Sequence, residues 1–155
     1  MIAWIKVPRP QSNEIFRTYK ISKRFDDDIS AVCLCVNLSV SNGLISFASI
    51  GVGGVAATPA KAYQTEDSLR GEPFRMGTFN KACKIIADEF QPLSDMRGSA
   101  AYRKHILGSL LKRFAIETLE LNNLEIQPTD TKTQGEFWID LSDPKTSELK
   151  LSSFS

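Results

Sequence analysis

The stretch with the clearest chemical potential is a block of opposite charges, Y-K-I-S-K-R-F-D-D-D-I-S-A-V, over residues 19–32. Three cations, Lys20, Lys23 and Arg24, precede three consecutive aspartates, and the block leads directly into an apolar segment. Such charges beside a rigid strand can hold a charged ligand or a partner surface. The alternative, which composition alone favours, is a surface turn whose charges neutralise one another in water.

The three cysteines, Cys33, Cys35 and Cys83, do not form a metal-binding pattern. Cys33 and Cys35 are two residues apart in a predicted strand, so they should share one face and act as small buried side chains. A zinc or iron–sulfur site needs more ligands, and the single histidine, His105, is on a distant predicted helix. We therefore expect no metal in this chain and no hydrolase site of the Ser/Cys–His–acid kind.

A glycine-rich segment, G-V-G-G-V-A-A-T-P, covers residues 51–59. It lacks the Lys-Ser/Thr ending of a P-loop and the G-x-G-x-x-G spacing, so a phosphate cradle is not favoured. The sequence instead predicts a bulge or a close backbone approach at the edge of a sheet.

The elements that must position these residues follow from the hydrophobic periodicity. Apolar and polar residues alternate over residues 31–40, which predicts a strand. Asn42-Gly43 then predicts a tight hairpin to a second strand over residues 44–50. An earlier short strand is expected over residues 2–7, ended by a proline.

Three helices are expected after the hairpin. The first covers residues 59–69, and the second runs from Thr78, as N-cap, to Phe90. The third begins after Ser99. One side of this helix is predicted to be apolar and to consist of Tyr102, Ile106, Leu107, Leu110 and Phe114. The opposite side is predicted to be cationic and to consist of Arg103, Lys104, Lys112 and Arg113.

The composition of the 155 residues, 42% of them hydrophobic, fits one domain with a real core. Residues 1–116 hold 16 Lys and Arg against 10 Asp and Glu, a net +6, whereas residues 117–155 hold 3 against 8, a net −5. The cations are scattered, so we expect no nucleic-acid partner. No apolar run is long enough to span a bilayer, and the N-terminus lacks the order of residues of a signal peptide. We therefore expect no membrane contact and a cytoplasmic location.

Four stretches together carry a family resemblance: F-R-T-Y-K-I-S-K-R-F-D-D-D-I-S-A-V, G-V-G-G-V-A-A-T-P-A-K-A, P-L-S-D-M-R-G-S-A-A-Y-R-K-H and L-L-K-R-F. In order and spacing they resemble the C-terminal domain of the flavoprotein subunit of molybdenum hydroxylases, as in bacterial xanthine dehydrogenase and carbon monoxide dehydrogenase. The resemblance covers residues 1–116 and implies an α+β fold, an antiparallel β-sheet covered by helices. Residues 117–155 fall outside it and form an acidic tail of unknown role.

The resemblance implies a role in an oxidoreductase complex. In this family electrons pass from a molybdenum centre through iron–sulfur clusters to FAD, and then to NAD or another acceptor. The implied partners are a separate FAD-binding domain and a molybdenum-binding subunit. The family's motif lysine, which contacts FAD, corresponds to Lys20. The following loop, with Lys23, Arg24 and Asp27, would shape the potential around the flavin.

The family's FAD-binding domain and iron–sulfur modules are not in this sequence. We therefore expect a fragment or a split subunit that binds FAD weakly or not at all when alone, and is inactive without its partners. The alternative is a non-catalytic interaction module that retains the fold and docks its acidic tail on a basic partner.

Overall fold

The computed structural model describes residues 4–9, 11–24, 29–123 and 136–140. The chain divides into two compact units, residues 13–127 and a smaller unit of residues 1–12 with 128–155. Among the described residues, no helix combines the length and the apolar character that crossing a lipid bilayer requires.

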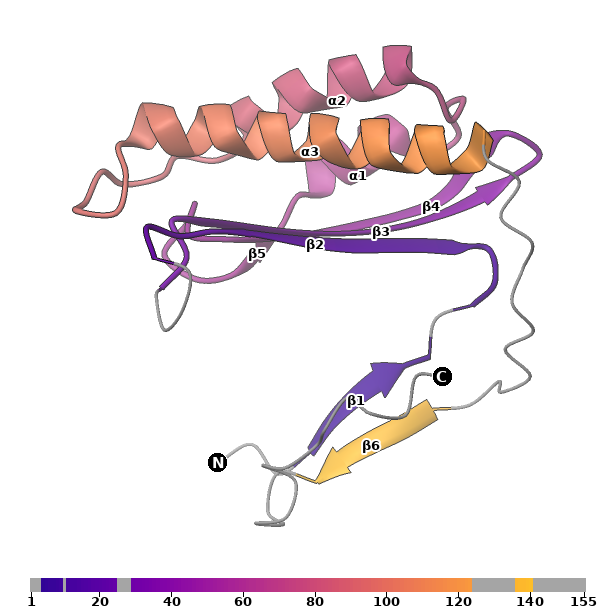
Figure 1. The fold of residues 1–155 in the computed structure, drawn as a ribbon, viewed down its shortest axis with the longest axis horizontal. Helices are drawn as coiled ribbons and strands as arrows, with labels where there is room; N and C mark the ends of the chain where they lie inside the picture. The colour runs from indigo at the N-terminus through magenta and orange to yellow at the C-terminus, as the bar shows by residue number, and fades with distance from the viewer. Residues whose placement is uncertain (1–3, 10, 25–28, 124–135, 141–155) are drawn as a thin grey trace. The chain divides into compact units, whose positions relative to one another are not determined.

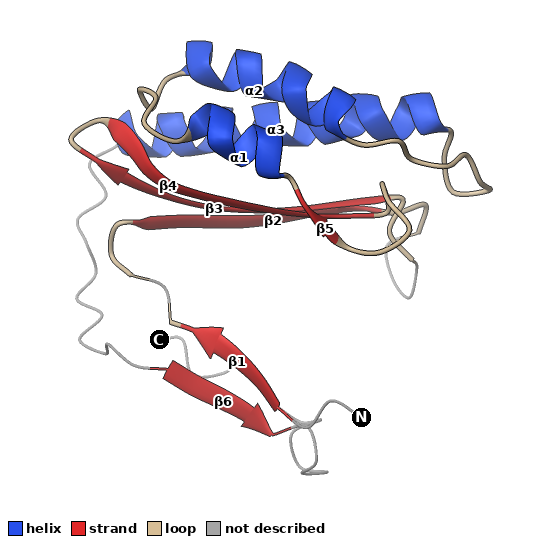
Figure 2. Ribbon diagram, turned by 180° about the vertical axis from the view of Figure 1, so that it is seen from behind, coloured by secondary structure: helices blue, strands red, loops and turns tan. Residues whose placement is uncertain are grey.

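The larger unit is a four-stranded antiparallel sheet with helices on one face (Figure 1). Its strands lie in the order β2 (Glu14–Ile21), β3 (Val32–Ser41), β4 (Leu44–Gly53) and β5 (Ala60–Lys61). The helices are α1 (Tyr63–Leu69), α2 (Met76–Glu89) and α3 (Ala100–Asn123), and Figure 2 shows all three on the same side of the sheet. This confirms the predicted α+β fold.

Alternation along β3 decides which face of the sheet is buried. Val32, Leu34, Val36 and Leu38 are fully buried beneath the helices, whereas the residues between them are only half-buried. The core is completed mainly by side chains of α2 and α3, including Phe79, Ile86, Leu107, Leu111 and Phe114. Among the described residues of this unit, no helix covers the other face of the sheet, which we call the open face.

The tight turns of the sheet follow the predictions. Asn42 and Gly43 both have positive φ, 51° and 75°, as the turn of the β3–β4 hairpin requires. Gly54 has a φ of 79°, and a Cβ on it would lie 2.4 Å from the carbonyl oxygen of Ala31. The predicted close backbone approach in the glycine-rich segment is thus confirmed.

Several element boundaries differ from the predictions. Ala60 and Lys61 form β5, so α1 begins at Tyr63 rather than at residue 59. Thr78 is not an N-cap, because α2 already begins at Met76 and the Thr78 hydroxyl donates to the Pro73 carbonyl oxygen at 2.8 Å.

The third helix begins where it was predicted to begin, but two residues predicted for its buried and exposed sides are exchanged. The Ser99 hydroxyl accepts a hydrogen bond from the Tyr102 N–H at 3.2 Å, which confirms Ser99 as a cap. Arg103 is buried and Tyr102 is 42% exposed, so their predicted sides were wrong. The helix continues past residue 116 to Asn123, and the proposed domain boundary at residue 116 stays a prediction.

The smaller unit contains β1 (Trp4–Pro8) and β6 (Glu136–Asp140), which pair antiparallel with Ile5 opposite Ile139. A strand near residues 2–7 was predicted, and β1 lies there with Pro8 as its last residue. Most of the predicted acidic tail lies outside the described residues.

Candidate functional site

Lys20 lies near the end of β2, on the sheet face that the helices leave open. It pairs with Cys33 of β3, and cross-strand partners point to the same side of a sheet. Its neighbour Tyr19 points to the other side and is buried, whereas Lys20 is exposed. The ammonium of Lys20 is therefore accessible to a ligand on the open face.

Small residues form a flat floor beside Lys20. Across the β3–β4 ladder, Cys33 is paired with Gly53 and Cys35 with Gly51. A Cβ on Gly53 would lie 3.4 Å from the Cβ of Cys33, and one on Gly51 would lie 4.0 Å from that of Cys35. Because neither glycine carries a side chain, β4 itself places no side chain beside the two thiols. The cysteines, predicted to be buried, are half-buried in this floor.

Lys61 of β5 and Tyr63, the first residue of α1, form one wall of this floor. Lys61 and the 63% exposed Tyr63 line the same shallow depression as the two cysteines, with a volume of about 740 Å³. The ammonium of Lys61 is 5.5 Å from the centroid of the Tyr63 ring and 3.5 Å from a carboxylate oxygen of the buried Glu66. A flat floor flanked by an aromatic ring and lysines suits a planar, electron-rich ligand.

The other predicted cofactor-binding residues belong to the turn after β2. The exposed Lys23 donates a hydrogen bond from Nζ to the Met96 carbonyl oxygen at 2.5 Å, which ties this turn to the loop between α2 and α3. Arg24 is exposed, and its carbonyl oxygen accepts from the Ser22 hydroxyl at 2.7 Å. Asp27 lies outside the described residues. A cofactor contact by these three residues stays a prediction.

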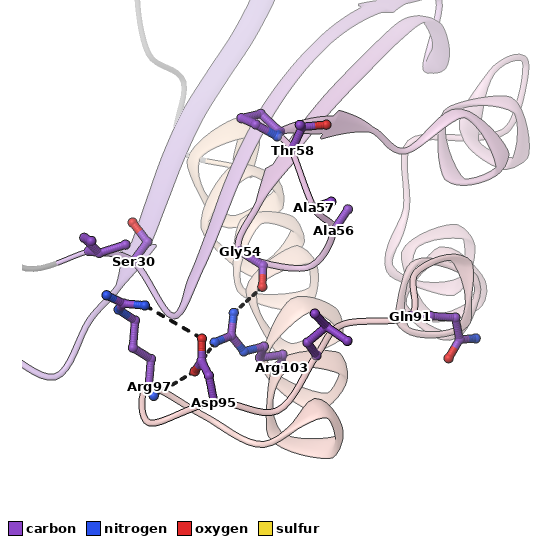
Figure 3. A pocket seen from close by; sticks show the side chains of 12 residues that line it. Ser30, Gly54, Ala56, Ala57, Thr58, Gln91, Asp95, Arg97 and Arg103 are labelled. Atoms are coloured by element: carbon purple, nitrogen blue, oxygen red, sulfur yellow. Dashed lines mark hydrogen bonds and ion pairs between the residues drawn. The ribbon is translucent and has the colours of Figure 1, made fainter.

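Arg103 joins three segments, namely the residues just before β3, the residues just after β4 and the loop that contains Asp95 (Figure 3). Its guanidinium donates to the carbonyl oxygens of Ala31, at 3.1 Å, and of Gly54. It also donates to the Asp95 carboxylate, with Nη2 2.5 Å from Oδ1. The side chain of Arg103 is only 6% exposed, so these acceptors replace water for a buried charge.

Asp95 is held by further donors in its own loop. Its Oδ1 accepts from the Arg97 N–H at 2.7 Å, and its Oδ2 is 3.8 Å from the Arg97 guanidinium. The Arg97 N–H and the Arg103 guanidinium are the main groups that lower the pKa of Asp95. A cavity of about 430 Å³ adjoins this cluster and is lined by Arg97, Gly54 and residues 56–59 of the glycine-rich loop (Figure 3). The cluster therefore ties the glycine-rich loop and the residue before β3 to the loop that contains Asp95.

The role of Arg103 was missed because a charged residue on a helix is normally assigned to the solvent side. A signal was present in the spacing. Arg103 precedes the buried Leu107 by four residues, and Leu107 precedes Leu111 by four, so all three lie on one helical row.

Comparisons with known proteins identify the family of this chain. Residues 17–118 match the CO dehydrogenase flavoprotein C-terminal domain family. The chain is 35% identical over 120 residues to a xanthine dehydrogenase of Blastobotrys adeninivorans, which covers 74% of this chain and 8% of that protein. It is 25% identical over 115 residues to the nicotinate dehydrogenase FAD-subunit of Eubacterium barkeri, covering 74% of this chain and 39% of that one.

A solved structure shares the fold. The reconstituted CO dehydrogenase from Oligotropha carboxidovorans matches with a TM-score of 0.63 and 31% identity, over 72% of this chain and 38% of that one. The chain thus spans less than half the length of these relatives. The match over residues 17–118 shows that the chain belongs to the CO dehydrogenase flavoprotein C-terminal domain family.

Proposed function

We propose that this chain completes the FAD site of a xanthine dehydrogenase-like oxidoreductase, in which a separate FAD-binding domain holds most of the cofactor. The observation that carries the proposal is the exposed Lys20 at the edge of a flat, open floor of small residues. Two relatives support it, since one is a xanthine dehydrogenase and the other is the FAD-subunit of a nicotinate dehydrogenase.

The residues of the open face fit a flavin. The isoalloxazine ring is planar, and Gly51 and Gly53 leave space for a flat ring to approach the sheet. Lys20 would donate from its ammonium to an oxygen of the cofactor, since a lysine is a compact charge with three donors. FAD supplies the electron-transfer chemistry when bound, and this chain supplies orientation and electrostatics.

We assign the charged turn after β2 a supporting electrostatic role. Lys23, Arg24 and Asp27 would set the potential at the rim of the flavin and its access to NAD or another acceptor. The contact of Lys23 with the Met96 carbonyl oxygen supports this role, because it anchors the turn to the loop that Asp95 and Arg103 hold. These charges would change the electrostatic potential at the flavin and would not take part in the electron transfer itself.

The proposed partners are the FAD-binding domain and the molybdenum-binding subunit of the same complex, in the cytoplasm. On this proposal the chain alone is colourless and inactive, because its open face offers one side of a flavin site. Electrons would enter the flavin from the molybdenum and iron–sulfur centres of the partners.

Reconstitution tests this proposal. The full chain is mixed with FAD and with a separately expressed FAD-binding domain of a xanthine dehydrogenase-like relative, and the complex is isolated by size exclusion. We expect a yellow complex that contains both proteins and FAD, and a colourless chain in the absence of the domain. A chain that binds FAD tightly by itself, or that leaves the FAD content of the isolated domain unchanged, would contradict the proposal.

A further inference from the structure

Two exposed aromatic side chains lie on the open face, beyond the floor beside Lys20. Phe16 of β2 is 51% exposed and Phe47 of β4 is 44% exposed. In the ladder Phe16 is paired with Asn37 of β3, and Phe47 is paired with Ser39, two residues further along the same strand. Phe16, Asn37 and Phe47, which we call the aromatic patch, therefore form one surface across three strands. We propose that the aromatic patch is the surface on which the FAD-binding domain docks.

Alternation along the strands places the aromatic patch on the same face as the proposed flavin site. Phe16 and Lys20 are four residues apart in β2, and Ala48, the neighbour of Phe47 in β4, is fully buried. Side chains four residues apart in a strand share a face, whereas neighbouring side chains point to opposite faces. Four residues of a strand span about 13 Å, so Phe16 lies about that far from Lys20. The patch and the flavin site are thus parts of one surface.

The size of protein interfaces identifies the occupant of this surface. A stable interface buries about 800 Å² on each partner, and a single flavin ring covers only a small part of that area. A domain of about 100 residues has a radius of gyration of about 13 Å, so a domain that holds the ring at Lys20 also reaches the aromatic patch. Exposed aromatic side chains are typical anchors of such interfaces. The inference rests on the proposed function, because it is the flavin at Lys20 that brings this domain to the open face.

Asn37 gives an independent indication of a partner. Its side-chain oxygen Oδ1 is buried and accepts no hydrogen bond from the residues that the structure describes. An unpaired buried oxygen destabilises the free chain, and a leucine at this strand position would avoid that cost. The amide of an asparagine turns easily about its last side-chain bond, so the oxygen can turn toward a donor that a partner brings to this face. The aromatic patch thus offers two apolar anchors and one acceptor between them.

The test measures the affinity of the full chain for the FAD-loaded binding domain of a xanthine dehydrogenase-like relative, by isothermal titration calorimetry with FAD in excess. Phe16→Ser and Phe47→Ser should each raise the dissociation constant about 30-fold, the effect typical of an interface anchor. The matched control is Tyr102→Ser, because Tyr102 is 42% exposed but belongs to α3, on the other face of the sheet. It should leave the constant unchanged, and thermal melting checks that each variant stays folded.

A further variant separates docking from folding. Asn37→Leu removes the unpaired oxygen, so it should melt at or above the wild-type temperature. The same change should raise the dissociation constant of the complex about 3–10-fold, because it removes the acceptor for the partner's hydrogen bond. An unchanged dissociation constant would overturn the assignment of Asn37 to the docking surface.

FAD retention distinguishes this inference from the proposed function. With enough chain to saturate the domain, the complexes of Phe16→Ser and Phe47→Ser should hold FAD as the wild type does, whereas Lys20→Ala should lose it. Wild-type affinity in both serine variants would overturn the docking proposal and leave the flavin role intact. Full FAD retention by Lys20→Ala, with weak docking of the serine variants, would overturn the flavin role alone. A chain that does not bind the domain, or that uses the aromatic patch to form a dimer with a second copy, would overturn the docking proposal.

Discussion

Replacing Arg103 by methionine should destabilise the larger unit severely. The change keeps the length of the side chain but removes the donors to the Ala31 and Gly54 carbonyl oxygens and to the Asp95 carboxylate. Asp95 is 41% exposed, so water can solvate its carboxylate again and no buried charge is left behind. The cost comes from the two carbonyl oxygens that lose their donor, at about 1–3 kcal/mol for each acceptor, and we expect about 3 kcal/mol in all.

Thermal and urea unfolding of the full chain, followed by circular dichroism, measure this loss. A change of about 3 kcal/mol corresponds to a melting temperature lower by on the order of 10 °C in a domain of this size. Arg103→Lys should fall between wild type and Arg103→Met, since one ammonium cannot reach three separate acceptors in the fork geometry of a guanidinium.

The matched control is Arg113→Met on the same helix. Arg113 is 64% exposed and pairs with Glu117 at 2.6 Å, so water screens this ion pair and its removal should lower the stability far less than Arg103→Met does. If Arg103→Met and Arg113→Met lowered the stability equally, the reasoning that Arg103 joins the three segments would be wrong.

Two further predictions concern backbone space and pH. Gly54→Ala should lower the melting temperature of the chain far more than Gly71→Ala. Both glycines have a φ of 79°, but of the two only Gly54 would place its new Cβ against another group, 2.4 Å from the Ala31 carbonyl oxygen. Equal melting temperatures of the two variants would count against this. The hydrogen bond from Tyr19, followed by that from a neighbouring arginine, lowers the pKa of Glu117. The ionised carboxylate of Glu117 therefore stabilises the folded state fully above the ordinary Glu pKa of about 4.3. This stabilisation is lost as the pH falls through the lower pKa that Glu117 has in the folded state. Glu117→Gln should therefore melt below the wild type at pH 7 and converge with it in acid, and a constant gap in melting curves would contradict this.

The hairpin of β3 and β4 could be predicted because its signals are local. Residues along β3 alternate between the core and the open face, and Asn42-Gly43 adopts the positive φ values that the turn needs. β2 was missed because its pattern is less regular. The apolar Phe16 is 51% exposed, while the charged Arg17 shares the helix-facing side with Tyr19.

The candidate site was predictable only in part, because its shape depends on contacts between distant segments. The charged block pointed to Lys20, but only its pairing with Cys33 decides which face it occupies. The flat floor exists because two glycines of β4 fall opposite two cysteines of β3, a register that neither segment encodes alone. The burial of Arg103 likewise depends on carbonyl oxygens 72 and 49 residues away in the chain.

The most direct measurement of the central claim is FAD retention by the reconstituted complex with Lys20→Ala, compared with wild type and with the control Lys84→Ala, an exposed lysine on α2. A hydrogen bond from a charged group contributes about 1.5–3 kcal/mol. Lys20→Ala should therefore raise the dissociation constant of FAD about 10–100-fold, and Lys84→Ala should leave it unchanged. A complex that holds FAD as tightly with Lys20→Ala as with the wild-type chain would contradict the account.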